Sequence, residues 1–257
     1  MKNFLAIDIG NTHITVGVYE GDRLILVFSI NSILEYSENE YYLIFEENFN
    51  KYNFLSLDFV GCGISSVVPE LTNKVKRAIE KLLKIESKII HSGLKLNFNN
   101  KYKEPTKLGI DRICSVSAGV NKYGHSLIIG DFGTATTIEV VNKNFDYLGG
   151  IIMPGLKTMV DSLHTKTSQL PEVDLNFPES IIGNSTDSCI KSGVLYGSLF
   201  VFETFIKKFQ EELGYKCKII VTGGFSNLIS LKTKKIDFIE KYLVLDGIRV
   251  IYNYNFI

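Results

Sequence analysis

The sequence lacks the features that mark secreted, membrane-spanning or zinc-binding proteins. Its four cysteines form no Cys-x-x-Cys pair, and its four histidines do not have the spacing of metal ligands. The longest uncharged stretch, from Ile219 to Leu231, has 13 residues, whereas a membrane-spanning helix needs about 20. Met1 and Lys2 lead directly into a predicted strand, which leaves no room for a signal peptide. We therefore expect a reduced, cytoplasmic protein with no structural zinc and no membrane partner.

Net charge and the common nucleotide motifs are missing as well. Lys and Arg total 28, as do Asp and Glu, so no overall field draws the chain to nucleic acid or to anionic membranes. Only four of the basic residues are Arg, which makes an Arg inside a motif informative. Neither G-x-x-x-x-G-K-[ST] nor a G-x-G-x-x-G after a strand occurs. A P-loop or Rossmann assignment therefore has no support.

What the sequence does contain is a repeated Asp-x-Gly signature. The first copy, Asp8 to Thr12, follows the apolar run Phe4–Ile7, and the second, Asp131 to Ala135, follows Leu127–Ile129. Each copy has the pattern of a buried strand that ends on a carboxylate and turns on a glycine. The aspartates are 131 − 8 = 123 residues apart, about half of the 257-residue chain. This spacing predicts two similar halves, each with one carboxylate, that face each other across a cleft.

Hydrophobic periodicity predicts a hairpin followed by helices in each half of a mixed α/β fold, which we divide into domains 1–120 and 121–257. For the first half we expect a hairpin over 14–30, a helix over 38–57, a strand over 59–64, a helix over 71–84 and a strand over 88–91. For the second half we expect a preceding helix over 111–123, a hairpin over 136–153, helices over 155–169 and 192–213, and a strand over 218–221.

The Asp-x-Gly turns suit the phosphates of a nucleotide. Glycine lets backbone N–H groups come close to phosphate oxygens, and the hydroxyls of Thr12, Thr134 and Thr136 add donors. The carboxylates of Asp8 and Asp131 can hold Mg²⁺ or a monovalent cation. One Asp-x-Gly alone is more often a simple turn, but two copies in matching contexts favour the nucleotide site.

Asp111 is the third carboxylate of interest. It follows Gly109 at the predicted start of a helix, where helix capping alone would explain an Asp. In a functional role it would accept the proton of a substrate hydroxyl that attacks the γ-phosphate. Arg112 beside it would bind an anionic group of the substrate, a task for which Arg is better suited than Lys.

The motifs together resemble those of the type III pantothenate kinases, in the acetate-and-sugar-kinase/Hsp70/actin superfamily. They occur in the expected order over nearly the whole chain. The matching segments are DIGNT at 8–12, ISSVVP at 64–69, Y-x-x-P-x-x-LG-x-DR at 102–112, DFGTATT at 131–137, GGIIMPGL at 149–156, LP at 170–171, IGNST at 182–186, TGG at 222–224 and L-x-L-x-GI at 243–248.

The resemblance implies a duplicated ribonuclease H-like, actin-like fold and a reaction in which ATP phosphorylates pantothenate to 4′-phosphopantothenate, the first step of coenzyme A biosynthesis. It implies that ATP, with Mg²⁺, is bound by Asp8, Ile9, Gly10, Asn11, Thr12, His13, Ile14, Thr15 and Thr134. It implies pantothenate contacts by Tyr102, Gly109, Ile110, Asp111, Arg112 and Thr186. Asp111 would be the catalytic base, Asp131 would bind K⁺ or NH₄⁺, and Asp8 is a candidate ligand for Mg²⁺. Members of the family are homodimers in which the partner completes the pantothenate pocket.

The match has two departures and leaves two alternatives. Asn184-Ser185 stand where a basic residue followed by Asn or Ser is expected, and segment 38–57 matches no family motif. One alternative is a kinase of the same fold for another small hydroxy compound. Tyr102 and Arg112 argue against it, because Arg112 fits the carboxylate of pantothenate, whereas a neutral sugar offers it no charge partner. The other is a non-catalytic regulator, which would be free to lose Asp8, Asp111 and Asp131.

Overall fold

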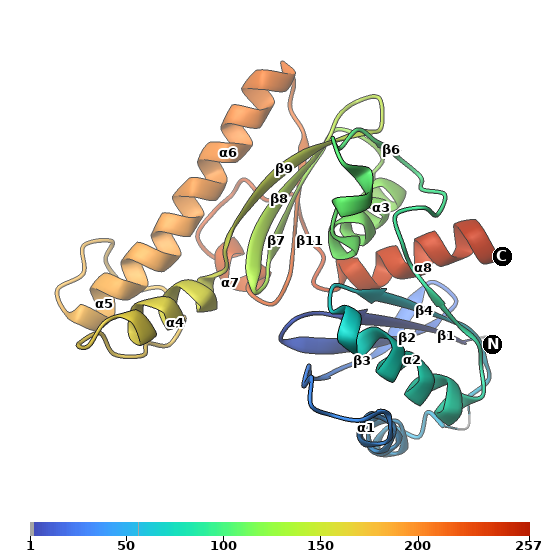
Figure 1. Cartoon of the computed structure of the whole chain (residues 1–257). Coiled ribbons are helices and arrows are strands. Elements are labelled where there is room, and N and C mark those ends of the chain that lie inside the picture. Colours follow the sequence, from blue (N-terminus) through green and yellow to red (C-terminus); the bar gives the residue numbers. More distant parts are fainter. Residues whose placement is uncertain (1–2, 56) are drawn as a thin grey trace. The chain divides into compact units, whose positions relative to one another are not determined.

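The computed structural model describes residues 3–55 and 57–257, which divide into two compact units (Figure 1). Unit 1 consists of Met1–Asn97, Lys103–Asn121 and Val244–Ile257, and unit 2 of Phe98–Tyr102 and Lys122–Leu243. The chain therefore enters unit 2 twice, first briefly at Phe98–Tyr102 and then for Lys122–Leu243, and it returns to unit 1 at Val244.

Unit 1 is built on a five-stranded sheet. Its strand order is β3 (Arg23–Asn31), β2 (His13–Glu20), β1 (Asn3–Ile9), β4 (Phe59–Ser66) and β5 (Ser87–Ile89). The first three strands are antiparallel, and β4 and β5 continue parallel to β1. The unit also contains helices α1 (Glu38–Lys51), α2 (Pro69–Leu83), α3 (Ile110–Tyr123) and α8 (Leu243–Phe256), and the 3-10 turn η1 (Pro105–Lys107).

Helix α1 explains the aromatic segment 38–57. Tyr41, Phe45 and Phe49 recur every four residues, so they share one face, and all three are buried in the core of unit 1. Ser37 and Glu40 form a capping box at the start of the helix. The helix ends at Lys51, earlier than predicted, and Asn53 just beyond it has a left-handed φ of 59°. Residue 56 of this prediction lies outside the described residues.

Unit 2 repeats the topology of unit 1. Its sheet has the order β11 (Phe238–Ile239), β10 (Lys218–Thr222), β7 (Leu127–Phe132), β8 (Ala135–Val141), β9 (Asp146–Pro154) and β6 (Asn99–Asn100). Strands β7, β8 and β9 form an antiparallel meander like β1, β2 and β3, and β10 joins β7 in parallel as β4 joins β1. The predicted duplication is thereby confirmed, because the two Asp-x-Gly turns follow equivalent strands.

The helices of unit 2 differ from the prediction at their boundaries, and the first of them ends at Lys166 rather than at 169. They are α4 (Leu156–Lys166), α5 (Thr186–Lys191), α6 (Gly197–Leu213) and α7 (Ser226–Ser230), with the π-helical turn η2 (Ser192–Tyr196) joining α5 to α6. The helical run thus begins at Thr186 rather than at 192, because Ser185 caps it by accepting from the Ser188 N–H. This run, Thr186–Leu213, is long and apolar enough to cross a membrane by length and composition, yet 44% of its most apolar window is buried inside the protein. Helices that pack in a protein core also meet these criteria of length and composition, so they are weak evidence for a membrane span.

Glycines allow α8 to pack closely against the strands and helix of unit 1. A Cβ on Gly61 of β4 would lie 2.3 Å from the Tyr252 hydroxyl, and one on Gly63 would lie 2.6 Å from Ile248. A Cβ on Gly247 of α8 would lie 1.9 Å from the backbone carbonyl oxygen of Cys114 on α3. Because this last neighbour is backbone, no side-chain rotation relieves the clash. Gly247 therefore allows α8 to lie directly against α3.

We predict that Gly247→Ala destabilises the protein. The added methyl group overlaps backbone, and overpacking of this kind costs about 1–3 kcal/mol or more. The matched control is Gly197→Ala in α6, where nothing lies within 4 Å of the added atom and alanine favours the helix by about 0.5–1 kcal/mol. Urea unfolding of both variants is the measurement. Equal midpoints for Gly247→Ala and the parent would contradict the close approach of α8 to α3.

Candidate active site

The first Asp-x-Gly turn places Asp8 at the end of the central strand of unit 1. In the sheet register Asp8 lies opposite Thr15 on β2 and Ser65 on β4. The turn that follows is closed by the Gly10 N–H, which donates to the His13 carbonyl at 3.0 Å. Asn11, Thr12 and His13 are exposed. The residues expected to bind phosphates thus form a short accessible loop beside a carboxylate.

Asp8 has an unusual environment for an acid. Its residue is only partly buried, but its Oδ1 atom is inaccessible and has no hydrogen-bond partner among the described residues. Burial first, and then the neighbouring charge of Asp111, raise the pKa of Asp8 from 3.8 to about 7, while the Ser65 hydroxyl acts in the opposite direction. Burial of an oxygen without a hydrogen-bond partner lowers the stability of the folded protein. A bound cation such as Mg²⁺ would give this atom a partner, so the atom fits a role as a cation ligand.

Asp8 and Asp111 are 111 − 8 = 103 residues apart in the sequence. The sheet of unit 1 and helix α3 bring them close enough for the charge of Asp111 to act on Asp8. Asp111 lies in the first turn of α3, and its Oδ1 accepts a hydrogen bond from the Arg112 N–H at 2.8 Å. A Cβ on Gly109 would lie 2.6 Å from that Oδ1, so the glycine leaves space for the carboxylate. The Arg112 side chain is buried. Two carboxylates and a guanidinium therefore belong to one region of unit 1.

Sequence reasoning missed two further residues of this region. Ser65 is fully buried opposite Asp8, where its hydroxyl acts to lower the pKa values of both Asp8 and Cys114. Burial, followed by the charges of Asp8 and Asp111, raises the pKa of the Cys114 thiol well above its ordinary range. Cys114 is thus a neutral, buried neighbour of both acids. The available signal was the position of Ser65 at the end of an apolar strand.

The second Asp-x-Gly turn places Asp131 in the equivalent position of unit 2. Asp131 lies opposite Thr137 on β8 and Thr222 on β10. Gly223 has a φ of 90°, and a Cβ there would lie 2.4 Å from Asp131 Oδ1 and 2.7 Å from the Phe132 carbonyl oxygen. A Cβ on Gly155 would lie 2.2 Å from the Gly133 carbonyl oxygen. Glycines thus keep space beside a carboxylate and carbonyl oxygens, which are the donors that hard cations prefer.

The remaining predicted residues lie on other parts of unit 2. Thr134 is exposed in the second turn, and its carbonyl accepts from Gly155 N and from the Thr158 hydroxyl. Tyr102 is half-buried beside the ring of Tyr147. Thr186 is exposed at the first turn of α5. Within the described residues no group of three His, Cys, Asp or Glu side chains forms a metal cluster, so a bound cation would need backbone or substrate oxygens as well.

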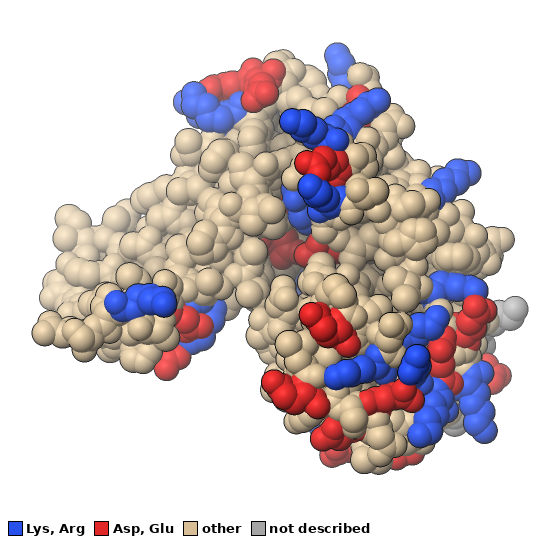
Figure 2. Space-filling model, viewed as in Figure 1, with Lys and Arg blue, Asp and Glu red and all other residues tan. Residues whose placement is uncertain are grey.

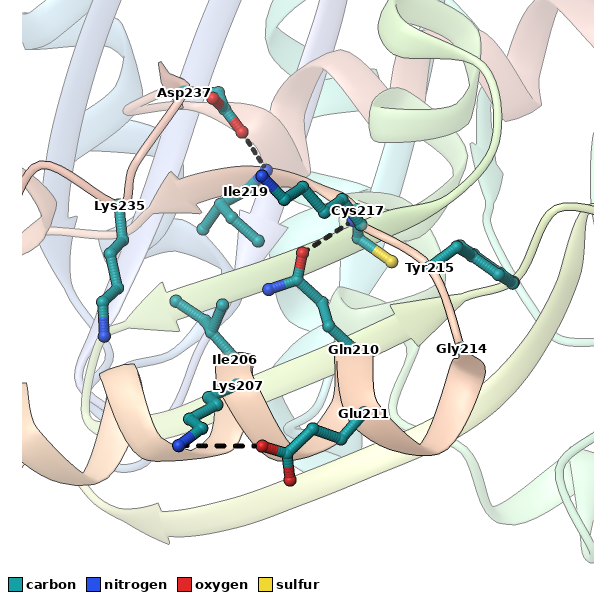
Figure 3. A pocket seen from close by; sticks show the side chains of 11 residues that line it. Ile206, Lys207, Gln210, Glu211, Gly214, Tyr215, Cys217, Ile219, Lys235 and Asp237 are labelled. Carbon is teal, nitrogen blue, oxygen red and sulfur yellow. Dashed lines mark hydrogen bonds and ion pairs between the residues drawn. The ribbon is translucent and has the colours of Figure 1, made fainter.

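A cavity of about 760 Å³ elsewhere in unit 2 contains none of the predicted site residues (Figure 3). It lies between the end of α6 and strand β10, over a floor that includes the buried Ile206, Cys217 and Ile219. Its polar side chains serve the fold: Gln210 accepts from the Cys217 N–H, and Asp237 accepts from the Ile219 N–H. These bonds fasten β10 to its neighbours, and the cavity is not part of the candidate site.

We predict that Asp8→Asn flattens the dependence of stability on pH. Because the pKa of Asp8 is raised from 3.8 to about 7, the folded protein binds more protons than the unfolded chain in this range. The free energy of unfolding therefore falls as pH rises from about 4 to about 7, by up to about 4 kcal/mol. Urea unfolding of the ligand-free variant should show a smaller loss, and the exposed-site control Asp174→Asn should behave like the parent. An unchanged pH dependence in Asp8→Asn would contradict the described environment.

Comparison with known proteins identifies the family. The model for type III pantothenate kinases matches residues 4–208. A protein from Finegoldia magna named type III pantothenate kinase is 37% identical over 254 residues, which cover 98% of this chain and 97% of that protein.

Solved structures support the fold. A conserved putative Baf family transcriptional activator from Campylobacter jejuni is similar with a TM-score of 0.62 at 19% identity, over 97% of both chains. An inorganic polyphosphate/ATP-glucomannokinase from an Arthrobacter strain has a TM-score of 0.52 at 11% identity, over 98% of this chain and 100% of that one. Identities this low show the fold alone, which is the duplicated α/β fold of actin-like kinases. On the family model and the extended sequence identity, the chain belongs to the type III pantothenate kinase family.

Proposed function

We propose that the chain phosphorylates pantothenate with ATP, using Asp111 as the proton acceptor. Family membership carries the reaction, which is the ATP-dependent step that opens coenzyme A biosynthesis. The observation that supports the assignment of roles is the pairing of Asp8 with Asp111, because Asp8 has a buried oxygen with no partner among the described residues. Such groups are expensive to bury and are typical of sites that bind charged ligands.

In this proposal Asp111 takes the proton of the pantothenate hydroxyl as its oxygen attacks the γ-phosphorus of ATP. The bond from the γ-phosphorus to the bridging oxygen breaks, and ADP leaves with that electron pair. The backbone of the loop from Asp8 to Thr15 binds the phosphates, with Thr134 as a further donor. Asp8 would hold Mg²⁺, which would supply charge neutralisation at the phosphates. Arg112 binds the pantothenate carboxylate, and Tyr102, Gly109, Ile110 and Thr186 complete the contacts.

We further propose a monovalent cation, K⁺ or NH₄⁺, at Asp131. The supporting observation is the space that Gly223 and Gly155 leave beside Asp131 Oδ1 and the carbonyls of Phe132 and Gly133. Oxygen donors of this kind suit a weakly hydrated cation. We also assign the enzyme to the cytoplasm, in keeping with its unpaired cysteines.

The homodimer is the last part of the proposal. Large apolar side chains are exposed on unit 2 at Ile152, Ile181, Ile182, Phe200 and Val201. Over much of α6 the surface has few charged side chains, whereas Lys, Arg, Asp and Glu are interspersed over α1 and α2 (Figure 2). Exposed apolar patches of this kind indicate a contact with another protein, and a second copy of the chain is the partner that the family resemblance implies.

The alternative that the protein is a non-catalytic regulator would be supported by the absence of kinase activity. The similarity to the putative transcriptional activator extends to the fold alone, since the identity is 19%. Retention of Asp8, Asp111 and Asp131 favours the kinase.

We predict that Asp111→Asn lowers kcat by at least about 100-fold, as expected for loss of a general base, and leaves KM for ATP nearly unchanged. A coupled assay of ADP release with pantothenate, run with and without K⁺ or NH₄⁺, is the measurement. The control Asp161→Asn removes an exposed carboxylate of α4 that pairs with Lys157 and should retain activity. No ADP release by the folded parent protein in any of these salts would overturn the kinase and favour the regulator.

We predict that Phe200→Glu converts the dimer to a monomer, because a charge in an apolar interface is costly to bury. Light scattering after size-exclusion chromatography gives the mass. The control Leu43→Glu alters a side chain that is similarly exposed, on α1 of unit 1, and should leave the dimer intact. A monomeric parent protein would show that the apolar surface of α6 serves another purpose.

A further inference from the structure

The segment that carries Tyr102 is fastened to the edge of the unit 2 sheet. Strand β6 pairs with β9 in parallel, with Asn99 opposite Asp146 and Asn100 opposite Tyr147. The Lys101 N–H donates to the Tyr147 carbonyl at 3.0 Å, and the Tyr102 N–H donates to Asn100 Oδ1 at 3.0 Å. The backbone of Tyr102 is therefore placed by β9.

The ring of Tyr102 also has its own support. The Tyr147 ring lies 6.1 Å from the Tyr102 ring and 6.1 Å from the Phe98 ring, between centroids. Tyr147 is fully buried, and its hydroxyl donates to Glu139 Oε2 at 2.6 Å. A Phe at this position would pack in the same way but could not form the hydrogen bond. The hydroxyl of Tyr147 therefore serves to fix the orientation of its ring.

Glu139 is the residue of the Tyr102–Tyr147–Glu139 group whose burial costs the most free energy, because it is an acid. It lies on β8 with 1% of its surface exposed, and a buried carboxylate is retained only where other groups compensate for its lost hydration. The proposed reaction assigns no role to Glu139. Its Oε2 accepts a buried hydrogen bond from the Tyr147 hydroxyl, and the loss of either partner would leave the other buried without it.

The Gly149-Gly150 motif brings these side chains together. The register between β8 and β9 shifts between Val140 and Val141, since Val141 lies opposite Tyr147 and Val140 opposite Gly149. Leu148 is thus the extra residue of a β-bulge, and Gly149 beside it has a φ of 112°. A Cβ on Gly149 would lie 3.6 Å from the Tyr102 ring, so Tyr102 lies directly over the bulge.

We propose that Tyr147 and Glu139 are positioning residues that hold the Tyr102 ring in the orientation that binds pantothenate. This inference rests on the proposed contact between Tyr102 and pantothenate. Tyr147 fixes the ring by packing, Glu139 fixes Tyr147 by its hydrogen bond, and Gly149 supplies the φ of 112° that the bulge beneath the ring adopts. All of these groups belong to unit 2.

The test is a double-mutant cycle of Tyr147→Phe and Tyr102→Ala. Tyr147→Phe should raise KM for pantothenate about 5-fold, the effect of losing one buried hydrogen bond, while kcat and KM for ATP change less than about 2-fold. In the Tyr102→Ala background the same substitution should have no further effect on KM, because its target is gone. The control Tyr215→Phe removes a hydroxyl that accepts from the Lys143 N–H in the same unit and should leave KM unchanged.

The possible outcomes distinguish the positioning role from the proposed function and from the proposed contact between Tyr102 and pantothenate. A folded parent that does not phosphorylate pantothenate overturns the function, and with it the positioning role. If Tyr102→Ala leaves KM for pantothenate unchanged, Tyr102 does not bind substrate and the positioning role is also overturned. If Tyr102→Ala raises KM but Tyr147→Phe lowers only the melting temperature, Tyr147 is structural and this proposal alone is wrong. Additive effects on KM would likewise overturn it.

Discussion

The electrostatic repulsion between Asp8 and Asp111 is the constraint on which the rest of unit 1 depends. Two carboxylates in a partly buried region repel each other and lose hydration, and the Ser65 hydroxyl offsets only part of the effect on Asp8. Packing elsewhere in unit 1 supplies stability against this cost: the aromatic face of α1, the apolar strands and the close contact of α8 with α3. A bound cation and the phosphates would then find a carboxylate already in place, so binding pays little of the cost of arranging it.

The same topology serves different chemistry in the two units. Asp8 and Asp131 occupy equivalent ends of equivalent strands, but the neighbours of Asp8 are another acid and a buried serine, whereas those of Asp131 are glycines and carbonyl oxygens. Equivalent backbones thus present a repelled carboxylate in one unit and an oxygen-lined space in the other. The difference comes from Asp111 on α3 and from Gly223 after β10. Both residues lie outside the repeated signature itself.

The sequence predicted most of the fold because its signals are local. The hairpins, the central strands and helices α2 and α3 follow from periodicity, and the duplicated sheet follows from the repeat of Asp8 and Asp131. The start of α5 was misplaced because the Ser185 cap precedes a short helix with no clear apolar face. The roles of Ser65, Glu139 and Tyr147 depend on strand register and on a bulge. Register joins residues that are distant in sequence, so local patterns do not reveal it.

Helix α8 returns to unit 1 after the chain has completed unit 2. During synthesis the N-terminal sheet must therefore wait for more than half of the chain before the hollows at Gly61 and Gly63 are filled. Until then its apolar surface is exposed, and α3 lacks the helix that lies against Cys114. Folding of unit 1 is consequently a long-range event, slow relative to the local hairpins. The carboxylates of unit 1 therefore acquire their final surroundings only when α8 packs against α3, after the second sheet has been made.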